Sequence, residues 1–236
     1  MNTDPLKMFY CKYGFKQSDI LKYSIGENYL AIMLNNGCIG VAASLKNKIT
    51  IEISELNSPN FNRFEHRLFL MGYYNALLNY KNTYETEADI FKVIGFEKYK
   101  NLVMVGLFES LYKNLKNNGI SPIVFDQGKN DDRTQPMEKQ KEFLKNTNAL
   151  ILTSTSIING SYVNLIRQIP QNCDVFMLGP SGILSKEMFY YFPNISYIFG
   201  SVFNKFDYDL LELIERGAGT KGFLNHLKKV YIKNEL

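Results

Sequence analysis

The sequence contains no tryptophan, only two histidines and only three cysteines in 236 residues. The histidines, His66 and His226, are not accompanied by a Gly-x-Ser-x-Gly pattern, which argues against a Ser-His-Asp hydrolase. The cysteines Cys11, Cys38 and Cys173 are far apart and form no Cys-x-x-Cys pair, so they suit free buried thiols in a reducing compartment. A His-Glu-x-x-His motif and clustered histidines are also missing, so the spacing of residues indicates no transition-metal site.

Long apolar runs and charge of a single sign are absent as well. No run approaches the roughly 20 residues needed to span a bilayer, and the first residues lack a continuous apolar signal core. The 27 Lys and Arg against 23 Asp and Glu leave a net charge of +4, which is too mild to indicate nucleic acid binding. We therefore expect a cytoplasmic protein that binds neither nucleic acid nor a membrane, and the sequence leaves homo-oligomerisation open.

What is present is ample apolar material, 45% of residues, arranged in two different ways along the chain. The first third predicts a small α+β unit, because Asn36-Gly37 is a strong hairpin signal between two apolar runs. Alternating isoleucines predict a third strand, and apolar residues at helical spacing predict a helix that packs on the sheet. The expected elements are a helix near Ser18 to Tyr23, strands at 29–34, 38–45 and 48–53, and a helix at 65–80.

From about residue 86 apolar runs alternate with helical segments, which predicts a parallel sheet with right-handed crossovers. We therefore expect an α/β protein of two domains, an α+β domain at 1–85 and a Rossmann-like α/β domain at 86–236. Asp207 is a plausible N-cap for the helix that begins at Tyr208. The expected strands are 100–105, 121–125, 149–152, 174–178, 195–199 and 230–232, and the helices are 107–118, 141–146, 161–169, 185–191 and 208–216.

Small or polar residues follow four of these strands, at Gly106, Asp126, Thr153 to Thr155 and Gly179 to Ser181. The carboxyl ends of parallel strands share one edge, where open α/β sheets bind ligands. Gly106 permits close backbone approach, and the helix after it offers free N–H groups to an anion; it is equally a plain turn glycine.

Asp126 follows Gly106 by 20 residues, the placement at which Rossmann proteins hold a ribose hydroxyl. The alternative is a solvated Asp that ends a strand. A Gly-x-Gly-x-x-Gly fingerprint is absent after Gly106, which argues against ordinary dinucleotide binding.

Two further groups could carry chemistry. Thr153, Ser154, Thr155, Ser156, Asn159 and Ser161 form either a hydroxyl-rich site or ordinary helix caps and turns. Asn75 and Asn79 share one face of the predicted helix 65–80, which could face the strand ends of the second domain. A hard-cation site is the remaining alternative to a solvated surface for the scattered carboxylates Glu52, Glu55, Glu65, Glu109 and Asp126.

Several segments, in one order along nearly the whole chain, resemble a known family of unknown function, the "putative heavy-metal chelation" proteins. The segments are GYYNALLN (72–79), VMVGLF (103–108), LTSTSIINGS (152–161), LGPSGIL (178–184), GSV (200–202), GAGTK (217–221) and the strand at 229–232. The resemblance implies an enolase-N-terminal-like domain followed by a Rossmann-like domain. It also implies a ligand cleft between them, which binds a metal or a metal chelate.

Carried over by position, the cleft includes Asn75, Gly106, Thr153, Asn159, Gly179, Pro180 and Ser181. The chain departs from the family pattern at Ser154, in place of glycine, at Gly182 and Ile183, in place of threonine and proline, and near Asn204, where aspartate is usual. We expect the changes at Gly182 and Ile183 to widen or loosen the pocket.

The sequence therefore predicts a binding protein for a small anionic ligand, a metal ion or a metal chelate in the cleft between the domains. The predicted ligand-binding residues are Asn75, Gly106, Asp126, Thr153, Ser154, Asn159, Gly179, Pro180 and Ser181. An enzyme that uses a nucleotide-like cofactor for group transfer, with Asp126 on a ribose, is the alternative. The sequence identifies no catalytic residue and no metal ligand, and a divalent or heavy-metal ion is the cofactor that the resemblance suggests.

Overall fold

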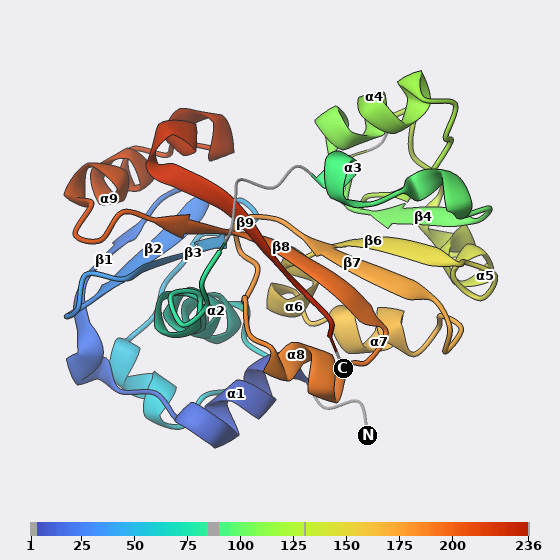
Figure 1. Ribbon diagram of the computed structural model, residues 1–236. Helices are drawn as coiled ribbons and strands as arrows, with labels where there is room; N and C mark the ends of the chain where they lie inside the picture. The colour runs from blue at the N-terminus through green and yellow to red at the C-terminus, as the bar shows by residue number, and fades with distance from the viewer. Residues whose placement is uncertain (1–3, 85–89, 130, 236) are drawn as a thin grey trace.

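The computed structural model describes residues 4–84, 90–129 and 131–235, so the predicted domain boundary between 85 and 86 lies outside the described residues. The fold is α/β, with a three-stranded antiparallel sheet and a six-stranded, mostly parallel sheet (Figure 1). In the described part of the chain no helix is long and apolar enough to cross a membrane.

The three-stranded sheet has the order β1 (Ile20–Ile25), β2 (Tyr29–Leu34) and β3 (Ile39–Ala43). The predicted β2–β3 hairpin is confirmed, and Gly37 adopts the positive φ of 80° that its turn requires. The predicted helix at 18–23 is wrong, because Ile20–Ile25 pairs along the free edge of β2 instead. A three-stranded meander therefore forms, but its third strand precedes the hairpin in the sequence.

The predicted strand at 48–53 is also wrong. This segment forms no ladder and leads into the 3-10 helix η2 (Ile53–Asn57), while Ile49, Ile51 and Ile53 pack against the core. Partners from elsewhere occupy the outer edge of β3. The Ala43 N–H donates to Ser181 Oγ at 3.0 Å, and the Ile39 N–H donates to the Tyr80 hydroxyl at 3.1 Å. The alternating isoleucines therefore bury one face without pairing.

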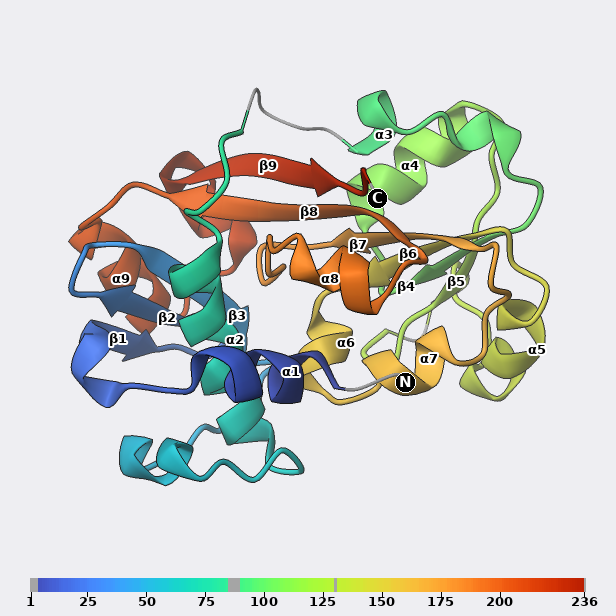
Figure 2. The ribbon, with the colours of Figure 1, turned by 60° about the horizontal axis from the view of Figure 1, so that its bottom comes forward.

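Helix α2 (Phe64–Leu78) confirms the helix predicted at 65–80 and lies between the three-stranded sheet and helix α1, Pro5–Tyr13 (Figure 1 and Figure 2). Its apolar residues are buried nearly all round, because it packs on β2 and β3 and also on α1 and α6 (Thr155–Ile158). The approach to β3 is very close, since a Cβ on Gly40 would lie 2.1 Å from the Gly72 carbonyl oxygen. Only glycine allows this contact.

The opposite face of the small sheet is covered by the C-terminal part of the chain. Helix α9 (Tyr208–Glu215) packs on β1 and β2, and its Leu210, Leu211 and Ile214 join Ala31 and Val41 in one apolar cluster. The predicted cap is confirmed, because Asp207 accepts the Leu210 N–H at 3.0 Å. Figure 1 shows α2 and α9 on opposite sides of this sheet.

The six-stranded sheet has the order β5-β4-β6-β7-β8-β9, in which only β9 runs antiparallel to its neighbour. All six predicted strands are confirmed, and β8 extends beyond its predicted end. The strands are β4 (Leu102–Val105), β5 (Ile123–Phe125), β6 (Ala149–Thr153), β7 (Asp174–Leu178), β8 (Ile195–Phe203) and β9 (Leu227–Lys233). The remaining helical elements are η1 (Gln17–Asp19), α3 (Ile90–Val93), η3 (Phe96–Lys98), α4 (Glu109–Asn117), η4 (Met137–Lys139), α5 (Gln140–Leu144), α7 (Tyr162–Ile166), α8 (Glu187–Tyr191) and η5 (Thr220–His226).

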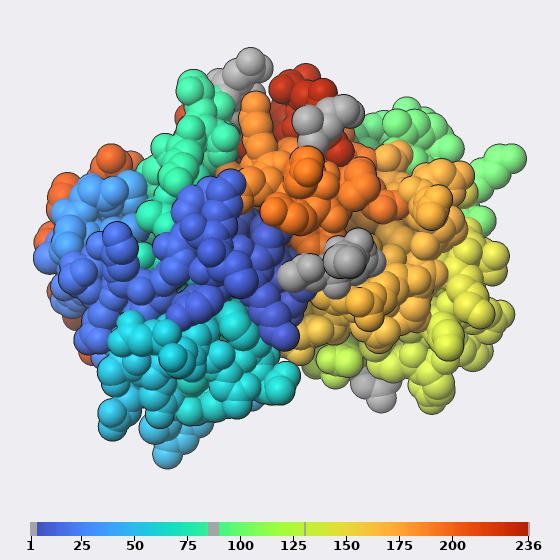
Figure 3. All heavy atoms as spheres, turned by 90° about the horizontal axis from the view of Figure 1, so that it is seen from below, coloured from blue at the N-terminus to red at the C-terminus, as the bar shows by residue number. Residues whose placement is uncertain are grey.

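Helix α1 was not predicted, although Asp4 accepts the Leu6 and Lys7 N–H groups as its N-cap and Pro5 fills the first helical position. It connects the N-terminal part of the chain to α8, which follows β7. Lys12 and Tyr13 both donate to Glu187 Oε1 of α8, at 2.6 and 2.5 Å. Figure 3 shows the N-terminal segment (blue) directly against the segment that contains α8 (orange).

Candidate functional site

The carboxyl ends of β4 and β6 form the centre of the candidate site. In the strand order, β5 lies on one side of β4 and β6 on the other, so the sheet changes winding direction between β4 and β6. Doubly wound sheets bind ligands at this switch point. Gly106 follows β4 with φ of 91°, and a Cβ there would lie 2.9 Å from Thr153 Cβ. The structure therefore brings together the Gly106 and Thr153 that the sequence predicted.

Asp126 lies at the same edge, after β5. One carboxylate oxygen accepts the Leu107 N–H at 2.7 Å and the other accepts the Gly128 N–H at 2.8 Å. Asp126 therefore fixes the backbone next to Gly106, as an Asx turn does. Because both oxygens already accept N–H groups, this arrangement favours a positioning role over a free ribose ligand.

The hydroxyl-rich turn after β6 presents two side chains to the edge. Thr153 Oγ1 and Thr155 Oγ1 are 2.9 Å apart, and both residues are only half-buried. Ser156 instead donates to the Thr153 carbonyl at 2.7 Å, and Ser154 is completely buried. Thr155 is thus a contributor that the predicted set did not include, while Ser154 lies behind the edge.

The Gly-Pro-Ser loop follows β7, and its residues likewise lie either at the edge of the sheet or buried behind it. Gly179, with φ of 129°, has open space around its Cβ position, and Pro180 is half-buried. Ser181 is 1% exposed, and its hydroxyl accepts the Ala43 N–H of β3. Gly179 and Pro180 face the edge, whereas Ser181 joins the loop to the three-stranded sheet.

Asn75 of α2 and Asn79, the C-cap residue of this helix, bind the backbone of this loop. Asn75 Nδ2 donates to the carbonyls of Val41 and Ser181, at 2.8 and 2.9 Å. Asn79 donates to the Gly182 carbonyl at 2.9 Å and accepts the Leu184 N–H at 2.8 Å. The helix does face the strand-end loops as the sequence suggested, but both amides bind backbone and are buried.

Arg67, one turn into α2, plays a similar part for the hydroxyl turn and was not predicted. Its guanidinium donates to the carbonyls of Ile157 and Ile158 at the end of α6, and forms an ion pair with Asp4 at 2.8 Å. The arginine side chain is only 6% exposed. The sequence gives no sign of this role, because the partners of Arg67 are mainly backbone atoms of distant segments.

Asn159 lies at the far end of α6, exposed, and its Oδ1 accepts from the Ser161 N–H and hydroxyl. Its N–H donates to the Thr155 carbonyl at 3.0 Å, so Asn159 lies one helical turn from the strand ends and its side chain binds within its own turn. Of the other predicted residues, Gly106, Asp126, Thr153, Gly179 and Pro180 meet at the edge, and Asn75, Ser154 and Ser181 lie behind it. We call Gly106, Asp126, Thr153, Thr155, Gly179 and Pro180 the strand-end site.

The loop at Gly182 and Ile183 is packed against its surroundings. The Gly182 N–H donates to the Gly179 carbonyl at 3.0 Å, and a Cβ on Gly182 would lie 3.2 Å from Ser154 Oγ. Ile183 is 2% exposed and belongs to the main core. The two changes therefore fit a packed loop, in which Ser154 occupies the space beside a residue without a side chain.

Charges lie beside the strand-end site on α4 and the loop after β5. Lys129 forms an ion pair with Glu109 at 2.8 Å, and Arg133 binds Asp131 at 2.6 Å. The hydrogen bond from Lys129 holds the pKa of Glu109 below its ordinary value. These side chains are at least one third exposed or close to it, so the network is screened by solvent.

The donor set does not fit a soft metal ion held by protein side chains alone. Such ions prefer thiolates, but Cys38 follows the β2–β3 turn and Cys173 precedes β7, at the end of the strand remote from the site. Burial raises the pKa of the thiols of Cys38 and Cys173, that of Cys173 to about 12. The third cysteine, Cys11, is exposed on α1, so the prediction that all three thiols are buried is wrong for this residue. Within the described residues no three His, Cys, Asp or Glu side chains gather as a metal site would require, and the five scattered carboxylates are not brought together.

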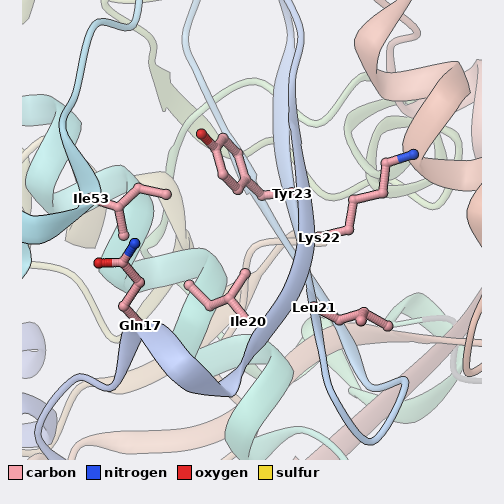
Figure 4. Close-up of a pocket in the computed structure, with 6 residues that line it drawn as sticks. All are labelled: Gln17, Ile20, Leu21, Lys22, Tyr23 and Ile53. Carbon is pink, nitrogen blue, oxygen red and sulfur yellow. The ribbon is translucent and has the colours of Figure 1, made fainter.

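Two surface hollows occur elsewhere. One, of about 270 Å³, lies at the outer strand β1 and is lined by Gln17, Ile20, Leu21, Lys22, Tyr23 and Ile53 (Figure 4). The other, of about 610 Å³, is lined by residues of α7, α8 and the loops that follow them, including Arg167 and Tyr191. Neither contains a predicted site residue. Strand β1 carries Lys22 and a bulge beside it, two features that typically prevent an outer strand from pairing with another chain.

Comparison with known proteins decides the family. A family model described as "Putative heavy-metal chelation", DUF364, matches residues 89–233, more than half of the chain. The chain belongs to the DUF364 family. No curated protein sequence matches it.

Two solved DUF364 structures share the fold. The protein from Pyrococcus horikoshii has a TM-score of 0.82 at 18% identity and covers 99% of this chain and 100% of its own. The protein from Desulfitobacterium hafniense has a TM-score of 0.75 at 14% identity, with 97% of each chain covered. Both are described as proteins of unknown function, and at these identities they establish the fold alone.

Proposed function

We propose that this DUF364 protein binds a small anionic molecule, free or as the organic part of a metal chelate, at the strand-end site. The observation that carries the proposal is the contact between Gly106 and Thr153 at the switch point. It places a glycine turn, two hydroxyls and the open Gly179 backbone at one edge of a buried sheet. Backbone N–H and hydroxyl groups are suited to anionic oxygens.

The family description suggests heavy-metal chelation, and the proposal accommodates it through the ligand rather than through protein side chains. In a metal chelate, the organic molecule supplies most of the metal ligands. The protein then needs to recognise only the outer oxygens of the chelate. Glycines and hydroxyls of the strand-end site fit that task, whereas the thiols of Cys38 and Cys173, whose pKa values burial raises, do not fit direct coordination.

Within this proposal the residues have two roles. Gly106, Thr153, Thr155, Gly179 and Pro180 contact the ligand. The residues behind them fix their positions: Asp126, Arg67, Asn75, Asn79 and Ser181 bind the backbones of the three loops. Preorganised loops bind more tightly because less conformational freedom is lost on binding.

Isothermal titration with citrate, nickel(II) citrate and nickel(II) alone tests the proposal. We expect heat from citrate and nickel citrate, and at least a tenfold weaker affinity for Thr153→Val, which corresponds to about 1.4 kcal/mol for a lost hydrogen bond. Ser161→Ala, which removes a hydroxyl near Asn159, is the control and should bind like the wild type. The absence of heat from both anions, or binding that Thr153→Val does not weaken, would contradict the proposal, as would a response to nickel(II) alone.

A further inference from the structure

The turn after β3 has an unusual backbone. Leu45 and Lys46 adopt φ of 52° and 59°, so two successive residues with side chains lie in the left-handed region. For a bulky residue such as leucine this conformation is a genuine outlier, since its Cβ crowds the following carbonyl. Strained residues of this kind persist where the surrounding structure holds them, and they gather at ligand sites.

Local hydrogen bonds hold the turn but do not explain its side chains. The Asn47 N–H and Nδ2 both donate to the Ser44 carbonyl, at 3.0 Å each. Ser44 is completely buried and donates to the Glu27 carbonyl at 2.5 Å. These bonds would form equally well with glycine at position 45. The leucine is nevertheless 43% exposed, so neither conformation nor core packing accounts for it.

The turn is adjacent to the Gly-Pro-Ser loop. Ala43, two residues before Leu45, donates its N–H to Ser181 Oγ at 3.0 Å. Because a residue advances the chain by at most about 3.6 Å, the backbone of Leu45 lies within roughly 7 Å of that contact. The exposed side chains of Leu45 and Lys46 therefore belong to a turn that lies close to the loop carrying Gly179 and Pro180.

We infer that the Leu45–Lys46 turn forms the wall of the ligand site opposite the strand ends, and that the ligand is an anion with an apolar part. Lys46 attracts the charge and Leu45 contacts the apolar part. This inference rests on the proposed function and adds the class of ligand to it.

Phosphate and phenyl phosphate separate the two contributions. The wild type should bind phenyl phosphate about fivefold more tightly than phosphate, because a ring placed against leucine leaves water. Leu45→Ala and Leu45→Gly should both reduce this ratio to near one. Lys46→Gln should weaken the binding of both anions by about threefold to fivefold, the range for an exposed charge pair. Lys48→Gln, at another exposed lysine of the same segment, is the matched control and should change neither.

Melting temperatures distinguish strain from simple truncation. Leu45→Gly relieves the positive φ, so its Tm should equal the wild-type value or exceed it by up to about 4 °C, while Leu45→Ala should gain nothing. If the wild type binds both anions and Gly106→Ala weakens them, but the variants at 45 and 46 retain the wild-type affinities, the inference is overturned and the proposed function stands. If the wild type binds citrate but neither phosphate nor phenyl phosphate, the inference is overturned and the proposed function stands; if it binds none of the three, the proposed function fails as well.

Discussion

The side-chain amide of Asn75 donates to the Ser181 carbonyl at 2.9 Å, and the same nitrogen donates to the Val41 carbonyl at 2.8 Å. One buried group on α2 thus joins the small sheet to the loop that follows β7. Asn75 is 1% exposed, so water cannot replace either bond. The geometry of the strand-end site therefore depends on the N-terminal part of the chain.

Asn75→Ala should lower the free energy of unfolding by about 1–3 kcal/mol, because two buried carbonyls lose a donor. Asn75→Asp should cost more at neutral pH, since a carboxylate would face two carbonyl oxygens, and less when acid protonates it. Urea unfolding followed by circular dichroism measures both. Asn118→Ala, which removes an exposed bond to the Asn114 carbonyl, is the control and should stay within about 0.5 kcal/mol. Equal losses for positions 75 and 118 would be incompatible with this role.

Gly106→Ala should be more harmful than the same change at Gly119. Both glycines have positive φ, of 91° and 75°, but a Cβ meets Thr153 only at Gly106. Gly119→Ala should therefore cost about 1 kcal/mol of strain alone, and Gly106→Ala a further 1–3 kcal/mol of overpacking. Chemical denaturation gives the comparison. Thr153→Gly should restore part of the stability in the Gly106→Ala background, and no coupling between the two positions would argue against their contact.

Arg67→Met should destabilise the protein by about 3–5 kcal/mol, because it breaks a buried ion pair with Asp4 and removes the guanidinium donor to the carbonyls of Phe61, Ile157 and Ile158. Arg216→Met removes an ion pair whose arginine is 77% exposed and should change stability by less than about 1 kcal/mol. Guanidinium unfolding at low protein concentration suits both variants. A loss below about 1 kcal/mol at Arg67 would show that its bonds to α6 matter little.

Alkaline pH should unfold the protein between about pH 10 and 12. Burial and the neighbouring Asp19 carboxylate raise the pKa of Tyr73 to about 12. Burial also raises the pKa values of Tyr80 and Tyr84 to about 12. Because these phenols bind their protons more tightly in the folded state, their stabilisation is complete below the ordinary pKa of 10.0 and decreases as the pH rises towards 12.

Phenolate absorbance and circular dichroism, recorded together, check this. The buried phenols of Tyr73, Tyr80 and Tyr84 should ionise together with the loss of structure. If all tyrosines titrated near pH 10 without unfolding, the buried environments would be wrong.

The strand ends could be predicted because their signals are local. A buried apolar run that stops at Gly106, Asp126, Thr153 or Gly179 identifies both the strand and its end, and alternation with helices makes these ends converge. The parallel sheet, the β2–β3 hairpin and α2 were predicted for the same reason. Family resemblance added the order of the motifs.

The remaining features depend on contacts between distant segments. The isoleucines at 49, 51 and 53 have strand periodicity, but Ser181 and Tyr80 occupy the edge that they would need. Similarly, residues 20–25 form a strand only because β2 offers a free edge. Asn75 and Ser181, which were predicted as ligand contacts, bind backbone groups of distant segments. The sequence patterns single out these residues, but they do not show which groups the residues contact.

Amide chemical-shift mapping during titration with phenyl phosphate tests directly whether the ligand binds at the strand ends. The largest shifts should occur at the backbone N–H groups of 106–108, 153–155 and 179, with smaller shifts at 45–47. The exposed Lys228 and Lys229 of β9 control for general anion attraction and should change little. Shifts confined to surface lysines, or none at the strand ends at saturating ligand, would contradict a binding site at the switch point.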